Sequence, residues 1–265
     1  MRRKRFGQHF LEPAWVAKLV TVVAPDPGDT VVEIGPGGGA LTLALAPRVG
    51  RLVAIEVDRD LADELEPRLP ANASILRADV LTLDLAALCS AYGPRPVRVV
   101  GNLPYNISSP ILFGLLAAHG DGKHISDATV MLQREVAERL AARPGGGDYG
   151  VLAVQAGLTA DVRLAFELPP GAFRPPPKVH SAVVRMDFHE PRPPVADPAR
   201  FTSVVRALFT QRRKTILNAL KHAAALDGPE ARAALDAAGI DPAARPEQVD
   251  VATFVRLVAA LPAGR

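Results

Sequence analysis

The sequence predicts an α/β protein, built on a doubly wound, mostly parallel sheet of seven strands and followed by a small C-terminal helical domain. Short runs rich in β-branched residues alternate with helical or loop-like segments through most of the chain, an arrangement typical of βα units. A glycine-rich turn follows the first run, and a proline-rich stretch near residue 190 precedes a segment of purely helical spacing. We therefore expect two domains, at residues 1–190 and 191–265.

Five runs are predicted to be parallel strands, because a helical or loop-like segment separates each from the next. They are TVVEIG (30–35), RLVAIEV (51–57), SILRADV (74–80), VRVVGNL (97–103) and DATVMLQ (127–133). Two later runs, VRLAFEL (162–168) and SAVVRMDF (181–188), have no long helical pattern between them. A parallel crossover needs about a dozen or more residues, usually with a helix, so we expect these two strands to pair antiparallel at the sheet's edge.

The domain boundary is predicted at EPRPPVADPAR (190–200), which contains four prolines in eleven residues. Beyond it, apolar and polar residues alternate at helical spacing. Short breaks occur at DGP (227–229) and near IDPAARP (240–246). This pattern predicts a small cluster of helices.

Composition indicates the class of protein. The 265 residues are 48% hydrophobic, and the single cysteine, Cys89, allows no internal disulfide. No apolar run reaches the roughly 18 to 20 residues that cross a bilayer, and we find no secretory signal pattern. The six histidines are scattered. We therefore expect a soluble, cytoplasmic protein that binds neither a membrane nor a metal.

Positive charge is concentrated in two places, although the net charge is only +3. Residues 2–5 are all cationic, and residues 204–222, which include Arg212, Arg213 and Lys214, contain no acidic residue. Such blocks suit the phosphates of nucleic acids. The alternative is a solvated tail and an ordinary basic helix face.

The glycine-rich turn predicts a cofactor site. In EIGPGGGALTLAL (33–45), Gly35 and Gly37 let the backbone turn tightly and approach a ligand. Glu56 follows Gly35 by 21 residues, at a strand end where a carboxylate accepts both hydroxyls of a ribose. Asp79, at the next strand end, is placed to accept from an adenine amino group. NAD and S-adenosylmethionine both satisfy this pattern, and the alternative for each acid is a solvated strand end.

Asn102-Leu103-Pro104-Tyr105 ends the fourth run, so it is expected at the same sheet edge as the glycine turn. The exocyclic amine of adenine is a poor nucleophile because its lone pair is delocalised into the ring. The Asn102 side-chain oxygen and a backbone carbonyl of Leu103 or Pro104 would each accept one N–H and direct the lone pair at a methyl donor. Tyr105 offers a face on which an extruded base stacks, worth roughly 1–3 kcal/mol. The alternative is that Asn102 caps the following helix and Tyr105 is a half-buried ring.

These motifs resemble the ribosomal RNA adenine dimethyltransferase family, specifically its small-subunit branch. The resemblance rests on GQHFL, EIGPGGGALT, Glu56, RADV, GNLPYNISSPI, FRPPPKVHS and LFTQRRKTILNAL, and it covers nearly the whole chain. It implies a Rossmann-like methyltransferase fold. It also implies that S-adenosylmethionine is the donor for dimethylation, at N6, of two adjacent adenines near the 3′ end of small-subunit rRNA. The partner would be the 30S subunit or its precursor, and we expect a monomer.

The resemblance also implies residue roles. Gln8, His9 and Leu11 would close over the cofactor, with Gly35 at its methionine part, Glu56 at the ribose, Asp79 at the adenine, and Asn102 at both cofactor and target amine. Phe173 would cover the base face opposite Tyr105. The family often has asparagine where His9 stands; because this contact is expected through backbone, the change predicts little effect.

Three other functions compete with this one. A large-subunit rRNA adenine methyltransferase that confers macrolide resistance has a similar motif, but more often with phenylalanine at the position of Tyr105. A mainly non-catalytic ribosome-assembly factor would not need Asn102 to Tyr105 intact. An NAD-dependent dehydrogenase would explain the glycine turn and Glu56, but not Asn102 to Tyr105 or the basic helical end.

Overall fold

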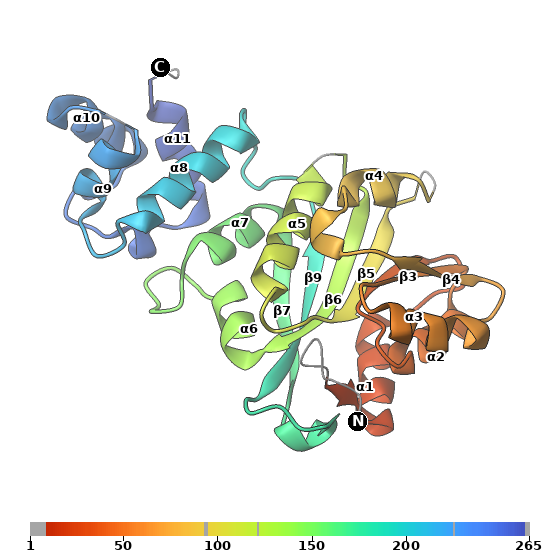
Figure 1. Ribbon diagram of the computed structural model, residues 1–265. Coiled ribbons are helices and arrows are strands. Elements are labelled where there is room, and N and C mark those ends of the chain that lie inside the picture. Colours follow the sequence, from red (N-terminus) through yellow and green to blue (C-terminus); the bar gives the residue numbers. More distant parts are fainter. Residues whose placement is uncertain (1–8, 93–94, 121, 225, 263–265) are drawn as a thin grey trace. The chain divides into compact units, whose positions relative to one another are not determined.

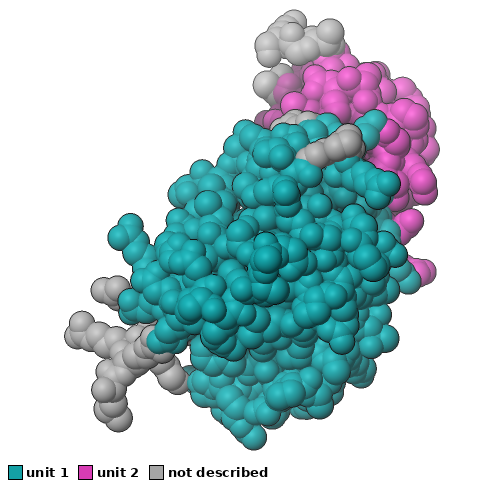
Figure 2. Space-filling model, turned by 90° about the vertical axis from the view of Figure 1, so that its right-hand side faces the viewer, with its two compact units in different colours: residues 1–137, 162–188 teal, residues 138–161, 189–265 magenta. Residues whose placement is uncertain are grey.

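The computed structural model describes residues 9–92, 95–120, 122–224 and 226–262. The chain forms two compact units, coloured separately in Figure 2. The first holds the described residues up to 137 together with residues 162–188, and the second holds residues 138–161 and 189–265. The expected boundary lay two residues away, after residue 190. The expectation also placed residues 138–161 in the first domain, whereas they cluster with the second unit.

The first unit is built on a seven-stranded sheet (Figure 1). Its strands are β2 (Thr30–Ile34), β3 (Arg51–Glu56), β4 (Ala73–Arg77), β5 (Val97–Asn102), β6 (Ile125–Gln133), β7 (Ala160–Leu168) and β9 (Ser181–Phe188). They lie in the order β4-β3-β2-β5-β6-β9-β7, and β2 to β6 run parallel. The predicted fold class is confirmed.

The last two strands complete the edge of the sheet. β9 pairs antiparallel with β6, with Val184 opposite Val130. β7 lies beyond β9, and an ion pair of 2.6 Å joins Arg163, near the start of β7, to Asp187, near the end of β9. The two strands therefore run in opposite directions, as the short connection between them predicts.

The central strands are buried on both faces, as in other doubly wound sheets. The helices of the first unit are α1 (Pro13–Val23), α2 (Ala40–Leu45), α3 (Arg59–Leu65), α4 (Leu85–Ser90) and α5 (Ser108–Gly120), and α6 (Arg134–Leu140) begins there. Side chains of α1 and α2 share one core with Val31 of β2, Ala54 of β3 and Val100 of β5. Val32 and Val53, which point to the opposite face, are equally buried.

A second, two-stranded pairing lies beside this core. β1 (Phe10–Leu11) pairs antiparallel with β8 (Phe173–Arg174), so that Leu11 is opposite Phe173. This pairing fastens the segment before α1 to the loop between β7 and β9.

The second unit is helical, as predicted. It contains α7 (Val151–Thr159), α8 (Pro198–Thr210), α9 (Ile216–Ala223), α10 (Gly228–Ala238) and α11 (Val251–Ala260), which enclose one apolar core. Local sequence sets the helix starts: Asp197, Asp227 and Asp250 each accept a hydrogen bond from a backbone amide in the first turn of α8, α10 and α11. Two of these caps explain why the chain breaks at DGP and after IDPAARP.

Candidate active site

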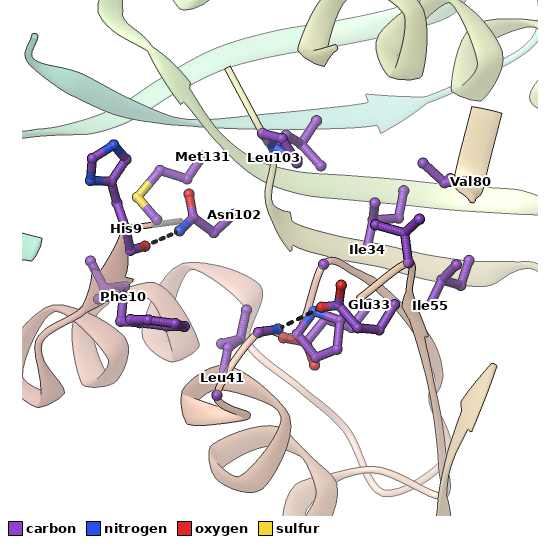
Figure 3. A pocket seen from close by; sticks show the side chains of 18 of the residues that line it. His9, Phe10, Glu33, Ile34, Leu41, Ile55, Val80, Asn102, Leu103 and Met131 are labelled. Carbon is purple, nitrogen blue, oxygen red and sulfur yellow. Dashed lines mark hydrogen bonds between the residues drawn. The ribbon is translucent and has the colours of Figure 1, made fainter. Parts of the chain in front are cut away.

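A cavity of about 570 Å³ opens at the carboxyl ends of β2, β3 and β5 (Figure 3). Apolar side chains from the strands and helices line its interior, among them Ile34, Leu41, Ile55, Leu103 and Met131. The glycine turn, Glu56, Asp79 and residues 102–107 line it as well. Ligands of open α/β sheets bind at this edge.

The glycine turn has the conformation that the sequence indicates. Gly37 has a φ of +54°, and Gly39, which precedes the first residue of α2, has a φ of +81°. A Cβ on Gly39 would lie 2.3 Å from Leu65 Cδ1, so a larger residue would be strained at this positive φ and would require the Leu65 side chain to shift. The positive φ values let the backbone turn tightly beside the cavity and begin α2 there.

Glu56 is held rigidly at the end of β3. Its Oε2 accepts from the Gly37 amide at 3.0 Å, and its Oε1 accepts from the Asp58 amide at 2.9 Å. Burial raises the pKa of Glu56 above its ordinary value, and these amide hydrogen bonds oppose the shift. Each oxygen keeps further acceptor capacity, which suits the pair of hydroxyls on a ribose.

Asp79 also lines the cavity, after the end of β4. Its Oδ1 accepts from the Leu81 amide at 2.9 Å, which caps the short 3-10 helix Val80–Thr82. The cap fixes the side chain at the strand end while its other oxygen has no hydrogen bond within the described residues.

Asn102 is the last residue of β5 and faces the cavity. Its Nδ2 donates to the backbone carbonyl of His9 at 2.9 Å. The next residue, Leu103, is buried, and its backbone amide donates a 3.1 Å hydrogen bond to the Met131 carbonyl oxygen. The turn of residues 102–105 is thus tied to the sheet on one side and to His9 on the other.

Tyr105 lies next to this turn in the cavity wall. Its hydroxyl shares a 2.6 Å hydrogen bond with the buried Ser181 hydroxyl. The His9 ring lies almost parallel to the Tyr105 ring, with centroids 5.9 Å apart, and His9 Nδ1 is 2.7 Å from the Pro175 carbonyl oxygen. Two aromatic rings with fixed orientations therefore lie together in the cavity wall.

Most of the predicted site residues meet at this cavity. Those brought together are His9, Leu11, Gly35, Gly37, Glu56, Asp79, Asn102, Leu103, Pro104 and Tyr105. Gln8, like the cationic residues 2–5, lies outside the described residues.

Phe173 is not brought to the cavity, contrary to the expected place opposite Tyr105. Its side chain is completely buried in the core beside α1, and it does not line the cavity. The physical reason is the β1–β8 pairing, which sets Phe173 opposite Leu11. Among the described residues, the ring that stacks with Tyr105 is that of His9.

Among the cavity residues that the sequence did not single out, Phe10 and Glu33 stand out. The Phe10 ring packs over the glycine turn, where a Cβ on Gly37 would lie 3.2 Å from Phe10 Cε1. Glu33, the residue before the last in β2, is only 1% exposed yet lines the cavity. The signal for Glu33 was available, because an acidic residue inside a strand that is buried on both faces is unusual.

The three candidate RNA-binding cations lie between α8 and α9 in the second unit. Arg212 pairs with Glu247 at 2.7 Å and donates to the Gly147 carbonyl, so its guanidinium is committed internally. Arg213 and Lys214 are exposed. Only these two present their charge freely to a ligand, as far as the described residues show.

Two features are absent from the described residues. None of the helices has both the length and the apolar character that spanning a membrane requires. No cluster of three or more histidine, cysteine, aspartate or glutamate side chains has an arrangement suited to a metal ion within the same part of the chain.

Comparison with known proteins identifies related sequences and structures. A family model described as ribosomal RNA adenine dimethylase matches residues 1–262. Ribosomal RNA small subunit methyltransferase A from Acinetobacter baylyi is 47% identical over 259 residues, which cover 96% of this chain and 90% of that protein. The protein of the same name from Pseudomonas aeruginosa is 45% identical over 270 residues, with 99% and 97% covered.

Two solved structures are also similar. A dimethyladenosine transferase from Plasmodium falciparum superposes with a TM-score of 0.76 at 25% identity, covering 94% of this chain and 96% of that one. The 23S rRNA methyltransferase ErmE superposes with a TM-score of 0.69 at 29% identity, covering 95% and 99%.

Proposed function

The chain belongs to the ribosomal RNA adenine dimethylase family, and from that premise we propose the reaction that it catalyses. It transfers methyl groups from S-adenosylmethionine to N6 of two adjacent adenines near the 3′ end of small-subunit rRNA, giving N6,N6-dimethyladenine during ribosome biogenesis. The substrate is the 30S subunit or its precursor. The proposal includes action as a monomer in the cytoplasm.

The orientation of the Asn102 amide carries this proposal. Because the His9 carbonyl only accepts, the Asn102 NH₂ must face it, which leaves Oδ1 to accept an N–H from another group. An exocyclic adenine amine has two N–H groups. Asn102 Oδ1 accepts one of them, and the backbone carbonyl of Leu103 or Pro104 accepts the other. Both contacts draw the nitrogen toward tetrahedral geometry and expose its lone pair.

Tyr105 positions the target base. An adenine extruded from the RNA stacks on an aromatic face at a gain of roughly 1–3 kcal/mol. Ser181 holds the Tyr105 hydroxyl and so fixes the orientation of the ring. Burial raises the pKa of Tyr105, which keeps the phenol neutral. The ring therefore serves as a platform and not as a base.

The cavity residues fit S-adenosylmethionine, whose sulfonium supplies the methyl group when the cofactor is bound. Glu56 accepts the ribose hydroxyls, Asp79 accepts the adenine amino group, and the Gly35–Gly37 turn leaves room for the methionine part. Residues 9–11 cover the bound cofactor. The target nitrogen loses its proton only after the methyl group arrives, so no strong general base is required.

The similarity favours small-subunit over large-subunit RNA. Relatives at 45–47% identity over nearly the whole chain are named for the small subunit, whereas ErmE, named for 23S rRNA, is 29% identical. The tyrosine at position 105 also favours the small-subunit reaction, because the large-subunit enzymes more often have phenylalanine there. Selection of one adenine pair comes from RNA shape and the assembled particle, because a protein of this size contacts few base edges. Arg213 and Lys214 contribute nonspecific affinity for phosphates.

The proposal is tested with labelled S-adenosylmethionine and purified ribosomal subunits from cells that lack this modification. We expect label in adenine of the small subunit and none in the large one. Transfer to the large subunit alone would establish the resistance-type reaction instead. Cofactor binding without transfer to either subunit would refute the proposed activity.

A further inference from the structure

Glu33 occupies a position in the sheet where apolar residues are the rule. It lies opposite Ala54 of β3 and Val100 of β5, and it points to the face that α1 and α2 cover. The side chain is 1% exposed but reaches the cavity wall, where Figure 3 labels it. The carboxyl group of Glu33 therefore lies in the protein interior, beside the cavity.

The structure does not compensate a negative charge there. Glu33 Oε2 is buried without a hydrogen-bond partner among the described residues. The Thr42 hydroxyl of α2 is near enough to favour the ionised form, but it too completes no hydrogen bond. The charged neighbour, Glu56 of β3, has the same sign of charge as an ionised Glu33. No arginine, lysine or histidine within the described residues forms an ion pair with Glu33.

A buried, unpaired carboxylate is costly, and such a group stays protonated instead. Burial accordingly raises the pKa of Glu33 to about 7, and repulsion from Glu56 adds to the shift. A positive charge brought into the cavity would reverse this preference, because an opposite charge nearby favours the carboxylate.

We infer that Glu33 makes the cavity selective for positively charged ligands and couples their binding to the release of one proton. With the cavity free of a cation, the neutral carboxyl holds the proton. When a cation binds, the proton leaves to solvent and the carboxylate pairs with the ligand's charge. The inference rests on the proposed function only for the identity of the ligand, a nucleoside that carries a sulfonium and an ammonium group.

This arrangement distinguishes ligands that share the same adenosine part. S-adenosylmethionine carries both cations, and its demethylated product, S-adenosylhomocysteine, keeps only the ammonium. Methylthioadenosine carries neither. Proton release is therefore expected to be largest for S-adenosylmethionine and absent for methylthioadenosine.

The test is isothermal titration calorimetry without RNA, from pH 6 to pH 8, in two buffers that differ in ionisation enthalpy. The dependence of the observed heat on the buffer counts the protons released. For the original protein we expect S-adenosylmethionine to release protons at pH 7 or below, with affinity falling up to tenfold per pH unit below pH 7. Glu33→Gln should bind with no such proton release and with a smaller preference for S-adenosylmethionine over methylthioadenosine.

Other cavity groups must be separated from Glu33. The titratable groups that line the same cavity are His9, Glu56, Asp79 and Tyr105. Imidazole side chains also titrate in this pH range, so His9→Asn is the matched control and should keep the proton release. Loss of proton release in His9→Asn, with none lost in Glu33→Gln, would assign the effect to His9 and overturn the inference.

The original protein alone gives a decisive result even if Glu33→Gln does not fold. Binding of S-adenosylmethionine without proton release between pH 6 and pH 8 overturns the inference. Because no RNA is present, that result leaves the proposed methyl transfer intact. Failure of methyl transfer with normal proton release would contradict the proposed function and leave the inference about Glu33 standing.

Discussion

The side-chain amide of Asn102 donates a 2.9 Å hydrogen bond to the backbone carbonyl of His9, across 93 residues of sequence. One contact therefore fixes two parts of the site: the direction of the Asn102 amide at the end of β5, and the position of His9 just before β1. Substitutions at Asn102 should thus affect cofactor binding as well as methyl transfer.

Asn102→Asp tests this relationship, because it replaces the donor with an acceptor facing the His9 carbonyl. We expect the Kd for S-adenosylmethionine to rise by about 10-fold, the cost of a broken hydrogen bond that leaves a partner unpaired. Calorimetry without RNA measures the effect. Asn106→Asp is the matched control, since it adds the same charge to an exposed cavity residue. Equal weakening in both variants would show that the hydrogen bond between Asn102 and His9 is not responsible.

Glu33→Gln should change the pH dependence of stability. The pKa of Glu33 is about 7 in the folded protein against an ordinary value of 4.5. The folded state therefore holds a proton that the unfolded chain releases, so the free energy of unfolding falls as pH rises from 4.5 to 7 and stays low above it. Glutamine removes this effect. Between pH 4 and pH 8, the free energy of unfolding of the original protein should therefore fall by roughly 3 kcal/mol relative to that of Glu33→Gln.

Urea denaturation of both proteins at several pH values measures this shift. Taking the difference between the two proteins cancels groups that titrate alike in both. A difference that is constant from pH 4 to pH 8 would contradict a raised pKa at Glu33.

Tyr105 variants separate stacking from hydrogen bonding. Tyr105→Phe keeps the aromatic face and loses only the bond to Ser181, so we expect a small change in KM for the RNA substrate. Tyr105→Ala loses the face, and KM should rise by roughly 10- to 100-fold. Ser181→Ala is the control and should match Tyr105→Phe. The platform role is excluded if Tyr105→Ala and Tyr105→Phe have equal KM values.

The three cations between α8 and α9 should differ in their effect on RNA binding. Arg213→Ala combined with Lys214→Ala should weaken binding to small-subunit rRNA and reduce the slope of log K against log salt by about 1–2, because each lost phosphate contact lowers it by about 0.9. Cofactor binding should not change.

Arg212→Ala should act differently, because Arg212 is paired with Glu247. We expect lower stability of the second unit and a smaller change in salt slope. Arg232→Ala, which removes an exposed cation of α10, is the matched control and should leave the slope unchanged. An unchanged slope in the Arg213 and Lys214 variant would remove these residues from the RNA interface.

The strands and the cofactor edge were predictable because local patterns determine them. Each parallel strand is a short run rich in β-branched and other apolar residues, and the glycines and acids that follow the runs must meet where parallel strands end. Asn102 to Tyr105 stands out because polar and proline residues stop such a run. The helices of the second unit start at aspartates that cap them, again a local signal.

What the sequence did not predict depends on contacts between distant segments. Phe173 is buried because β8 pairs with β1, more than 160 residues earlier, as the register of Leu11 with Phe173 shows. The same pairing draws His9 toward Tyr105, and no local pattern indicates that contact. Residues 151–159 form a helix whose packing partners, such as Phe254, lie far along the chain.

The central claim, that the Asn102 amide aligns the target nitrogen for methylation, is tested most directly with Asn102→Ala. Single-turnover transfer to unmethylated small subunits should be followed by mass spectrometry of the rRNA, with subunit association measured in parallel. We predict that the variant associates normally but that its transfer rate at saturating cofactor falls by at least about 100-fold, while the original protein yields dimethyladenine at two adjacent positions. Dimethylation by Asn102→Ala at close to the original rate would contradict the account.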